Sequence, residues 1–246
     1  MLGLFTDFGL HGPYTGLLKL ALAKWAPGVP VIDLFHDVPP FESQAAAYLL
    51  AAYVPEFPKG TVFLGVVDPG VGSARDGLIV HADDYWLVGP DNGLFDRVAA
   101  RAGRFEAWRI TWHPPRLSAS FHGRDLFAPV AGMLATQPSI ADALGQRIEL
   151  KLHDWPKELP RIIYIDHYGN AMTGIRAQAI PQAAQLIIDG QDLRWSRTFA
   201  QVPVGQGFWY ENSSGLVEIA VNQGSAAKCF DLRVGSGIQI MTESIG

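Results

Sequence analysis

The chain has 246 residues, a formal net charge of -5 at neutral pH, 48% hydrophobic residues and 17% charged residues. This apolar content excludes a disordered chain, and the length allows one large domain or two modest ones with real cores. Lysine and arginine residues are scattered along the sequence and form no basic stripe. We therefore expect no nucleic-acid partner.

Cysteine usage and the short apolar runs indicate the compartment. Cys229 has no second cysteine with which to form an internal disulfide, which fits a reducing environment. We interpret it as a packed, inert thiol in preference to a reactive nucleophile. The N-terminus lacks the basic flank of a signal peptide, and no apolar run is long enough for a membrane span. We expect a cytoplasmic protein with no membrane segment.

The first part of the chain alternates short apolar runs with helical patterns, which is typical of an α/β fold. We predict an N-terminal domain over residues 1–152, in which helices flank a central sheet. Its predicted strands are residues 1–6, 29–34 and 61–67, with a hairpin of residues 78–81 and 86–88 turning at Asp83-Asp84. Its predicted helices are residues 14–25, 43–53, 94–102 and 126–135, and Ser43 is expected to cap the second of them.

The second part has a different character. Residues 153–160 are polar and contain Pro156 and Pro160, so we predict an interdomain linker. Residues 161–246 are predicted to form an all-β domain, a small antiparallel barrel or sandwich, because Gly, Asn and Ser separate short apolar runs. These runs are residues 161–165, 185–188, 193–195, 207–211, 216–221 and 238–241.

Three polar segments border the apolar elements of the first domain, where ligands of open α/β sheets bind. Asp7 follows the first strand, and its carboxylate could accept hydrogen bonds from a ribose diol or cap the next turn. Asp68 and Arg75 bracket a glycine-rich turn and could form a functional pair or an ordinary salt bridge. His122 precedes a helix and could serve as a general base or be merely solvated.

The remaining polar motifs offer less. The histidines have no ligand spacing with one another or with Cys229, so we predict no metal site. Asp83-Asp84 and Asp91-Asn92 fit turns better than metal ligands. In the second domain, residues 166–170 and 212–215 adjoin strands and, by themselves, fit ordinary turns.

Taken in order, these segments resemble the S-adenosylmethionine (SAM) hydroxide adenosyltransferase family, also called SAM hydrolases, which is related to fluorinases and chlorinases. The resemblance spans nearly the whole chain and rests on the order and spacing of several motifs. These are Thr6-Asp7-Phe8-Gly9, Lys19, Pro39-Pro40, Asp68-Pro69-Gly70-Val71-Gly72 with Arg75, Gly89-Pro90-Asp91-Asn92-Gly93, Phe121-His122-Gly123-Arg124-Asp125, Asp166-His167-Tyr168-Gly169-Asn170, and Asn212-Ser213-Ser214-Gly215 followed by Glu218-Ile219-Ala220.

The resemblance implies hydrolysis of SAM to adenosine and methionine. It implies a catalytic set of Asp68, Arg75 and His122 that positions and activates a water molecule for attack on ribose C5′. No cofactor is expected, because SAM is the substrate. The resemblance further implies a homotrimer in which each site lies between the N-terminal domain of one subunit and the C-terminal domain of the next.

The resemblance also assigns the substrate-binding residues. Asp7 would bind the ribose hydroxyls and Phe41 would line the ribose pocket. Asn170 and the backbone near Gln223 would hold adenine, whereas the methionine amino and carboxylate groups would go to Asp166 and Ser213. The motifs that contain Val71 and Gly123 complete the predicted set.

Departures from the family pattern concern the methionine end. Many relatives carry an acidic residue where this chain has Leu10-His11-Gly12-Pro13, and halogenases carry an arginine where this chain has Ser214.

Three alternatives to a hydrolase remain. A halogenase is disfavoured because a fixed carboxylate at Asp68 would repel a halide ion and because the halogenase loop insertion is absent between Val71 and His81. A sensor that binds SAM or adenosine without turnover has no use for a joint Asp–Arg–His set. A metal-dependent phosphoesterase would be built on Asp7, Asp68 and His122 and would lose activity in a chelator.

Overall fold

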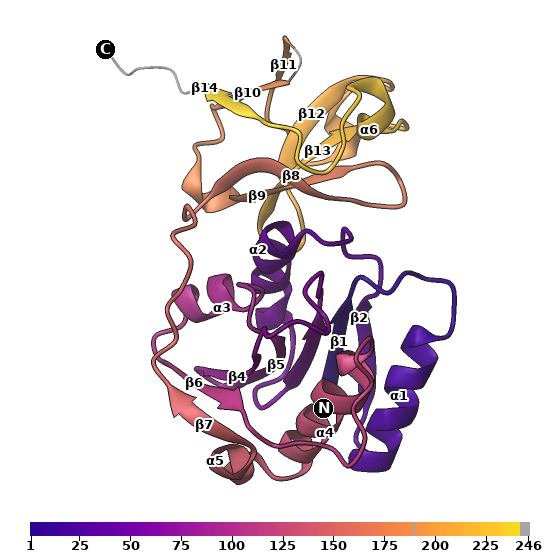
Figure 1. The fold of residues 1–246 in the computed structure, drawn as a ribbon. Coiled ribbons are helices and arrows are strands. Elements are labelled where there is room, and N and C mark those ends of the chain that lie inside the picture. The colour runs from indigo at the N-terminus through magenta and orange to yellow at the C-terminus, as the bar shows by residue number, and fades with distance from the viewer. Residues whose placement is uncertain (189, 242–246) are drawn as a thin grey trace. The chain divides into compact units, whose positions relative to one another are not determined.

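A computed structural model describes residues 1–188 and 190–241 of the chain (Figure 1). Residue 189 and residues 242–246, which belong to the predicted C-terminal domain, lie outside the described residues. The chain forms two compact units, unit 1 at Met1–His153 and unit 2 from Asp154 onward. Within the described ranges, no helix has both the length and the apolar character needed to cross a bilayer.

Unit 1, all of whose residues are described, is built on one large sheet. Its strands are Leu2–Thr6 (β1), Val31–Phe35 (β2), Val62–Val66 (β3), Gly77–Ala82 (β4), Tyr85–Pro90 (β5), Phe105–Ile110 (β6) and Gly145–Ile148 (β7). They form a seven-stranded sheet of order β2-β1-β3-β5-β4-β6-β7. Strands β2, β1, β3 and β5 are parallel, and the other three join antiparallel. β1 and β3 are buried throughout, as is usual for central strands covered on both faces.

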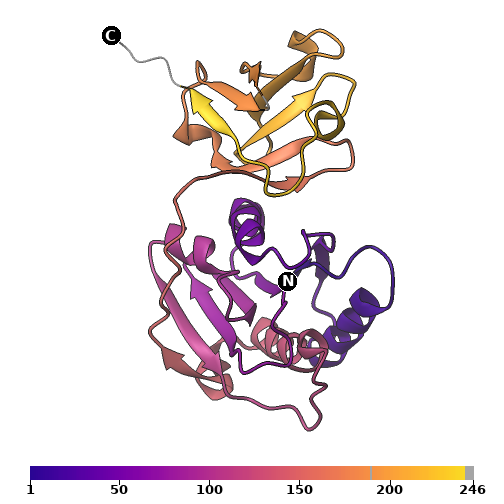
Figure 2. The same cartoon turned by 45° about the horizontal axis from the view of Figure 1, so that its top comes forward.

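Helices cover both faces of this sheet. They are Tyr14–Trp25 (α1), Ser43–Tyr53 (α2), Asp96–Arg101 (α3), Ala128–Thr136 (α4) and Ala141–Leu144 (α5), with 3-10 turns at Val54–Glu56 (η1) and Pro138–Ile140 (η3) and a π-helical turn at Gly123–Phe127 (η2). Helix α1 packs against α4, and α2 packs against α3. Figures 1 and 2 show the two pairs on different sides of the sheet. Leu18 and Leu134 anchor α1 and α4 in the same core as the strands.

The predicted α/β fold with its central sheet is confirmed, and several details are corrected. Strand β2 begins at Val31, two residues later than predicted. Ser43 does not cap α2: it is the first helical residue, the N-cap position is Glu42, and no side chain caps the helix. Helix α3 begins only at Asp96 because Leu94 and Phe95 form the preceding turn. Strands β6 and β7 were not predicted; exposed polar residues such as Glu106 interrupt the apolar pattern of β6.

Unit 2 is made mainly of short antiparallel strands. They are Leu159–Ile165 (β8), Ala171–Arg176 (β9), Gln185–Ile188 (β10), Gln191–Leu193 (β11), Gly207–Glu211 (β12), Leu216–Val221 (β13) and Gln239–Met241 (β14), with a helix at Ala226–Cys229 (α6) and 3-10 turns at Ala177–Ala179 (η4) and Phe199–Gln201 (η5). The described residues form a four-stranded sheet, β12-β13-β9-β8, and a three-stranded sheet, β11-β10-β14. Strand β9 and helix α6 were not predicted, β8 begins inside the predicted linker, and β11 ends at Leu193 instead of extending to Trp195.

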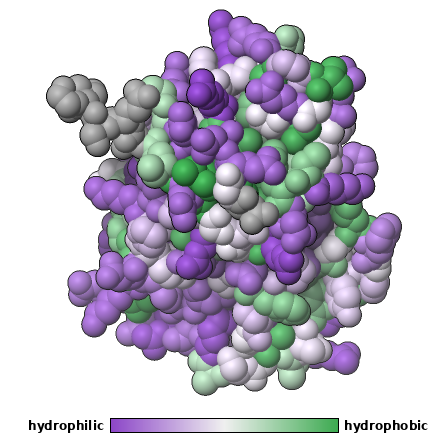
Figure 3. All heavy atoms as spheres, turned by 90° about the horizontal axis from the view of Figure 1, so that it is seen from above, coloured by the Kyte–Doolittle hydropathy of each residue, from purple (hydrophilic) through white to green (hydrophobic). Residues whose placement is uncertain are grey.

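The two sheets of unit 2 share one core. Ile162 and Ile219 of the larger sheet lie in the same cluster as Leu186 of the smaller sheet. Single bridges, Arg161–Gly237 and Trp195–Trp209, link the sheet edges. The described strands therefore form additional antiparallel sheets around a common core, without the continuous strand pairing of a closed barrel. On the face of the described residues shown in Figure 3, polar side chains dominate and apolar ones appear in small separate groups.

Sheet topology places two of the predicted site residues at one edge of unit 1. Parallel strands β1 and β3 are in register, with Thr6 opposite Val66. The backbone N–H of Asp7 donates to the carbonyl oxygen of Val66 at 3.3 Å. Asp68 lies two residues after Val66. Asp7 and Asp68 therefore both follow the C-terminal ends of neighbouring parallel strands, where ligands of such sheets bind.

Alanine substitutions at two glycines of unit 1 should change the free energy of unfolding in opposite directions. A methyl group at Gly89 of β5 would overlap the Gly65 carbonyl oxygen, whereas one at Gly16 of α1 meets nothing within 4 Å. We expect Gly89→Ala to lower the free energy of unfolding by about 1–3 kcal/mol. Gly16→Ala should raise it by about 0.5–1 kcal/mol because alanine favours the helix. Urea titrations followed by circular dichroism measure both, and equal effects would contradict this packing.

Candidate active site

A buried ion pair lies just beyond the C-terminal end of β3. Arg75 Nη2 lies 2.5 Å from Asp68 Oδ2, and the two side chains are 11% and 5% exposed. The loop between them folds back on itself, with the Val71 N–H donating to the Asp68 carbonyl oxygen. The Arg75 guanidinium lies over the Phe127 ring at 5.3 Å and also donates to the carbonyl oxygen of Asp76. The two residues that bracket the predicted turn are therefore in direct contact.

The pair has one free acceptor and one free donor. Asp68 Oδ1 and Arg75 Nε are both buried and have no hydrogen-bond partner among the described residues. Buried polar atoms normally find partners, so these two atoms are candidates for contact with a small polar group. A water molecule or hydroxyl group has the chemistry that each atom lacks, since its oxygen accepts from a guanidinium N–H and its hydrogen is donated to a carboxylate.

The segment Gly89–Gly93 holds both ends of the loop that carries this pair. Asn92 Nδ2 donates to the carbonyl oxygen of Val67 at 2.7 Å, directly before Asp68. The backbone N–H of Asp91 donates at 3.0 Å to the carbonyl oxygen of Asp76, directly after Arg75. The resemblance included this motif without giving it a role. Its structural role is to fix the backbone on either side of the ion pair.

His122 lies close enough to the pair to exchange electrostatic influence with it. It immediately precedes the π-helical turn η2, and the neighbouring Phe121 packs edge-on against Phe8 and Tyr14. Burial lowers the pKa of His122, and the positive charge of Arg75 lowers it further, whereas Asp68 acts in the opposite direction. The imidazole is therefore kept in its neutral form, which can accept a proton.

The two carboxyl groups at this edge have pKa values raised by burial. For Asp68, the positive charge and hydrogen bond of Arg75 counteract that rise, and His122 adds to the counteraction. For Asp7, the hydrogen bond from the Phe41 N–H counteracts it, and the nearby Asp68 adds to the rise. Asp7, Asp68, Arg75 and His122 thus form one interacting group, as predicted residues of a common site would.

Asp7 binds a strained backbone instead of capping a helix. Its Oδ2 accepts from the backbone N–H of Phe41 at 3.3 Å, while the N-cap of α1 is Pro13. Phe41 has φ +67° and an aromatic ring that is 72% exposed. A left-handed phenylalanine with an exposed ring is costly and is more usual at binding sites than elsewhere. Gly123 is buried under the Phe8 ring, and Val71 is partly exposed.

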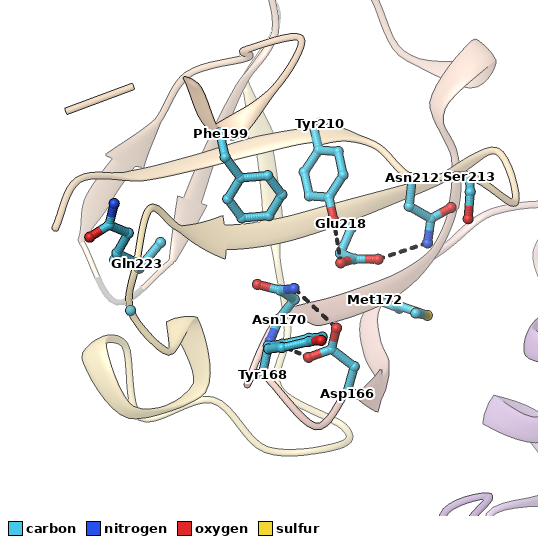
Figure 4. Close-up of a pocket in the computed structure, with 12 residues that line it drawn as sticks. Asp166, Tyr168, Asn170, Met172, Phe199, Tyr210, Asn212, Ser213, Glu218 and Gln223 are labelled. Atoms are coloured by element: carbon cyan, nitrogen blue, oxygen red, sulfur yellow. Dashed lines mark hydrogen bonds between the residues drawn. The ribbon is translucent and has the colours of Figure 1, made fainter. Parts of the chain in front are cut away.

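Unit 2 contains a cavity of about 800 Å³ (Figure 4), a volume in the range of small-molecule sites. Four predicted substrate-binding residues, Asp166, Asn170, Ser213 and Gln223, line it. Gln223 has φ +55°, so the predicted adenine-binding backbone is also left-handed. The other lining residues are Tyr168, Met172, Phe199, Tyr210, Asn212, Glu218, Val221 and Gly224.

A tight turn presents Asp166 and Asn170 to the cavity. Asp166 Oδ1 accepts from the Asn170 N–H at 2.8 Å, and Oδ2 accepts from Asn170 Nδ2 at 3.0 Å. Figure 4 shows the Asn170 side chain above the Tyr168 ring, the Asp166 side chain beside that ring, and both below Glu218 of β13. The amide oxygen of Asn170 and the second lone pairs of Asp166 remain for a ligand.

The sequence reasoning missed several residues of the opposite wall. Tyr210 and Asn212 both donate to the buried carboxyl of Glu218. Phe199 and the 76%-exposed Tyr168 supply aromatic surfaces. The signal for Glu218 was present as one acidic residue within an otherwise apolar strand, but the resemblance assigned it no role.

The structure therefore sorts the predicted site residues into two groups. Asp7, Phe41, Val71, Gly123 and the Asp–Arg–His set belong to unit 1, and the other four line the cavity of unit 2. Among the residues that the structure describes, no cluster of three or more His, Cys, Asp or Glu side chains could hold a metal ion.

The fold and these residues define an α/β protein with an added β unit, a charged cluster beside its parallel sheet and a pocket of nucleoside size. Family models match both units: the SAM hydroxide adenosyltransferase N-terminal domain matches residues 2–144 and the C-terminal domain matches residues 160–239. The chain belongs to the SAM hydroxide adenosyltransferase family.

Similar proteins agree with this assignment. The chain is 38% identical over 256 residues to a Thermus thermophilus protein named (R)-S-adenosyl-L-methionine hydrolase, covering 96% of this chain and 97% of that one. It is 24% identical over 288 residues to a fluorinase of Nocardia brasiliensis, with coverages of 98% and 96%. The crystal structure of an uncharacterized conserved protein from Thermotoga maritima superposes with a TM-score of 0.89 at 29% identity, covering 98% of this chain and 100% of that chain.

The electrostatics of unit 1 predict how the pKa of His122 responds to its neighbours. Arg75→Met removes a positive charge that lowers this pKa, so the pKa should rise toward the ordinary value of 6.5. Asp68→Asn removes a negative charge that raises it, so the pKa should fall further. Proton NMR titration of the imidazole, assigned with a His122→Gln variant, measures both shifts. Shifts of the same sign would show that the three residues do not interact as described.

Proposed function

We propose that this protein hydrolyses SAM to adenosine and methionine. The observation that carries the proposal is the buried Asp68–Arg75 pair, with its free acceptor and donor and with His122, whose pKa is lowered by burial and by Arg75, within electrostatic reach. Membership of the family and the extended similarity to a protein named as a SAM hydrolase support the same reaction. The protein is an enzyme that cleaves SAM.

The chemistry needs a placed water molecule and little else. The water oxygen forms a bond to ribose C5′ while the C5′–sulfur bond breaks and the sulfur keeps its electron pair. Adenosine, methionine and one proton result. Because the sulfonium is already a good leaving group, positioning of the nucleophile in line with the breaking bond should dominate catalysis. Hydroxide attack on a cation also neutralises charge, which a pocket sheltered from water favours.

Each residue of the catalytic set has a distinct task. Arg75 favours the deprotonated form of the water through its positive charge. Asp68 Oδ1 accepts a hydrogen bond from the water and orients it. His122, neutral because its pKa is lowered, accepts the released proton.

The substrate-binding roles follow the same assignment. Asp7 accepts hydrogen bonds from the ribose hydroxyls beside Phe41, while Val71 and Gly123 border the reacting carbon. Tyr168 and Phe199 present aromatic faces on which adenine stacks, as purines do on such rings.

The cavity residues of unit 2 take the polar groups of the substrate. Asn170 and the Gln223 backbone bind the adenine edge. Asp166 and Ser213 bind the amino and carboxylate groups of the methionine part.

Halide transfer is the weaker candidate. An incoming halide ion would meet the free, buried oxygen of Asp68, and the Coulomb repulsion between the two is strong at low dielectric. The similarity to a fluorinase is also much lower than that to the hydrolase, 24% against 38% identity.

We further propose a cytoplasmic homotrimer whose sites each combine unit 1 of one subunit with unit 2 of the next. Several large apolar side chains near the residues of the unit 1 cluster in sequence are exposed, namely Leu10, Tyr14, Phe41, Val71 and Leu117. Exposed apolar side chains gathered around a polar cluster are typical of a surface that another protein surface covers. The lone cysteine, Cys229, fits a reducing compartment, although the prediction that it is packed is wrong, because its side chain is exposed.

The direct test uses SAM in heavy-oxygen water. We expect the label on the 5′-oxygen of adenosine, detected by mass spectrometry, with unlabelled methionine. Stoichiometric binding without adenosine would instead identify a sensor. A product carrying chlorine or fluorine at C5′ in halide buffer would identify a halogenase, and turnover that stops in a chelator would point to a metal-dependent enzyme.

Hybrid trimers test the shared site. Asp68→Ala in unit 1 and Asn170→Ala in unit 2 should each lower turnover roughly 100-fold or more. Co-expression with two affinity tags yields trimers that contain both variants. If sites combine two subunits, every hybrid contains one site with both residues intact, and activity partly returns. Hybrids as inactive as either parent would place each site within one chain.

A further inference from the structure

Glu218 is a buried carboxyl group in an apolar strand. Glu218 lies on β13, and all the remaining residues of this strand are apolar and buried. Glu218 itself is 2% exposed and lines the cavity of unit 2. A buried carboxyl group costs free energy unless its neighbours or a ligand compensate for the lost hydration. We therefore expect the buried carboxyl group of Glu218 to have a function in this pocket.

The hydrogen bonds of Glu218 suit its ionised form. Tyr210 donates its hydroxyl to Oε1 at 2.5 Å, and Asn212 Nδ2 donates to Oε2 at 2.8 Å. Asn212 cannot turn its amide around, because its Oδ1 accepts from the N–H groups of Ser214 and Leu216 at 3.0 Å each. Each carboxylate oxygen therefore receives a donor, and the orientation of the group is fixed.

The charge of the pocket is unbalanced. Its charged lining residues are Asp166 and Glu218, and no Lys, Arg or His stands among the described residues that line it. Figure 4 shows the two carboxyl groups turned toward one another across the pocket. Burial raises the pKa of Glu218, and the negative charge of Asp166 raises it further. A positive ligand placed in this pocket would relieve the repulsion between the two groups.

We propose that Glu218 acts with Asp166 to select the positively charged sulfonium substrate over neutral thioethers and over the products. This rests on the proposed function. SAM carries two positive charges and one negative charge at neutral pH, for a net charge of +1. S-adenosylhomocysteine, which lacks the sulfonium methyl group, is a neutral zwitterion, as is methionine, and adenosine is uncharged. An anionic pocket therefore holds the substrate more tightly than it holds what remains after cleavage, which favours product release.

Glu218 serves as a specificity-determining residue, and its charge can be removed without changing its shape. In Glu218→Gln, the new amide N–H can donate to the Tyr210 hydroxyl, which accepts as well as donates. The remaining oxygen still accepts from Asn212. The matched control is Glu211→Gln, the same loss of charge on the exposed last residue of β12.

The experiment compares the dissociation constants of SAM and S-adenosylhomocysteine for the full-length protein. Calorimetry at pH 8 serves for S-adenosylhomocysteine. Single-turnover kinetics serve for SAM, or calorimetry if no adenosine forms. In Glu218→Gln, we expect SAM affinity to fall roughly 10-fold while S-adenosylhomocysteine affinity stays the same or rises. The ratio of the two constants should therefore collapse, and Glu211→Gln should keep the wild-type ratio.

Each other outcome is decisive. Equal weakening of both ligands would show that Glu218 only supports the fold of the pocket, and an unchanged ratio would show that its charge does not act on the ligand; both overturn the inference. SAM binding with a Glu218-dependent ratio but without adenosine formation would sink the proposed hydrolysis and keep the selectivity. A wild-type protein that binds neither ligand overturns both.

Discussion

The buried Asp68–Arg75 pair is the constraint on which the rest of the catalytic unit depends. Burying two charges is favourable only when their geometry and hydrogen bonds are nearly complete. Here the pair forms at 2.5 Å, the guanidinium lies over Phe127, and the backbone carbonyls before and after the loop are both held by the Gly89–Gly93 segment. Within the pair, Asp68 Oδ1 and Arg75 Nε have no hydrogen-bond partner among the described residues, so a ligand that bonds to them would offset part of the cost of burial.

The two units handle negative charge in opposite ways, and the proposed reaction needs both. In unit 1, Arg75 stands against Asp68, so the cluster can stabilise a developing hydroxide. In unit 2, Asp166 and Glu218 have no cation among the described residues that line the pocket, so the pocket favours a cation. In the proposed reaction, Arg75 would face the developing hydroxide and the two carboxyl groups of unit 2 would face the sulfonium.

The sequence predicted the elements whose residues form a regular local pattern of apolar and polar positions. Fully buried strands such as β1 and β3 have continuous apolar runs, and the residues that follow them, Asp7 and Asp68, were correctly placed at the sheet edge. Less regular elements escaped detection, because β6 mixes buried and exposed residues without a strict alternation and β9 contains Thr173 and Gly174. The capping role of Ser43 failed for a related reason: a serine near a helix start resembles a cap, but only the backbone angles show which residue holds that position.

Asn92 and Glu218 show why part of the candidate site could not be predicted from the sequence pattern. Asn92 acts on the catalytic loop through the Val67 carbonyl oxygen, 25 residues away in sequence, and a backbone acceptor leaves no trace in the pattern of side chains. Glu218 occupies a position where an alternating strand would normally expose a charge. Its burial follows from the packing of β13 between β9 and β12, with Tyr210 and Asn212 supplied by the neighbouring strand and turn. A polar residue in an apolar strand is thus ambiguous until tertiary structure shows whether water or protein surrounds it, and here the surrounding protein buries the carboxyl group and fixes its orientation in the pocket wall.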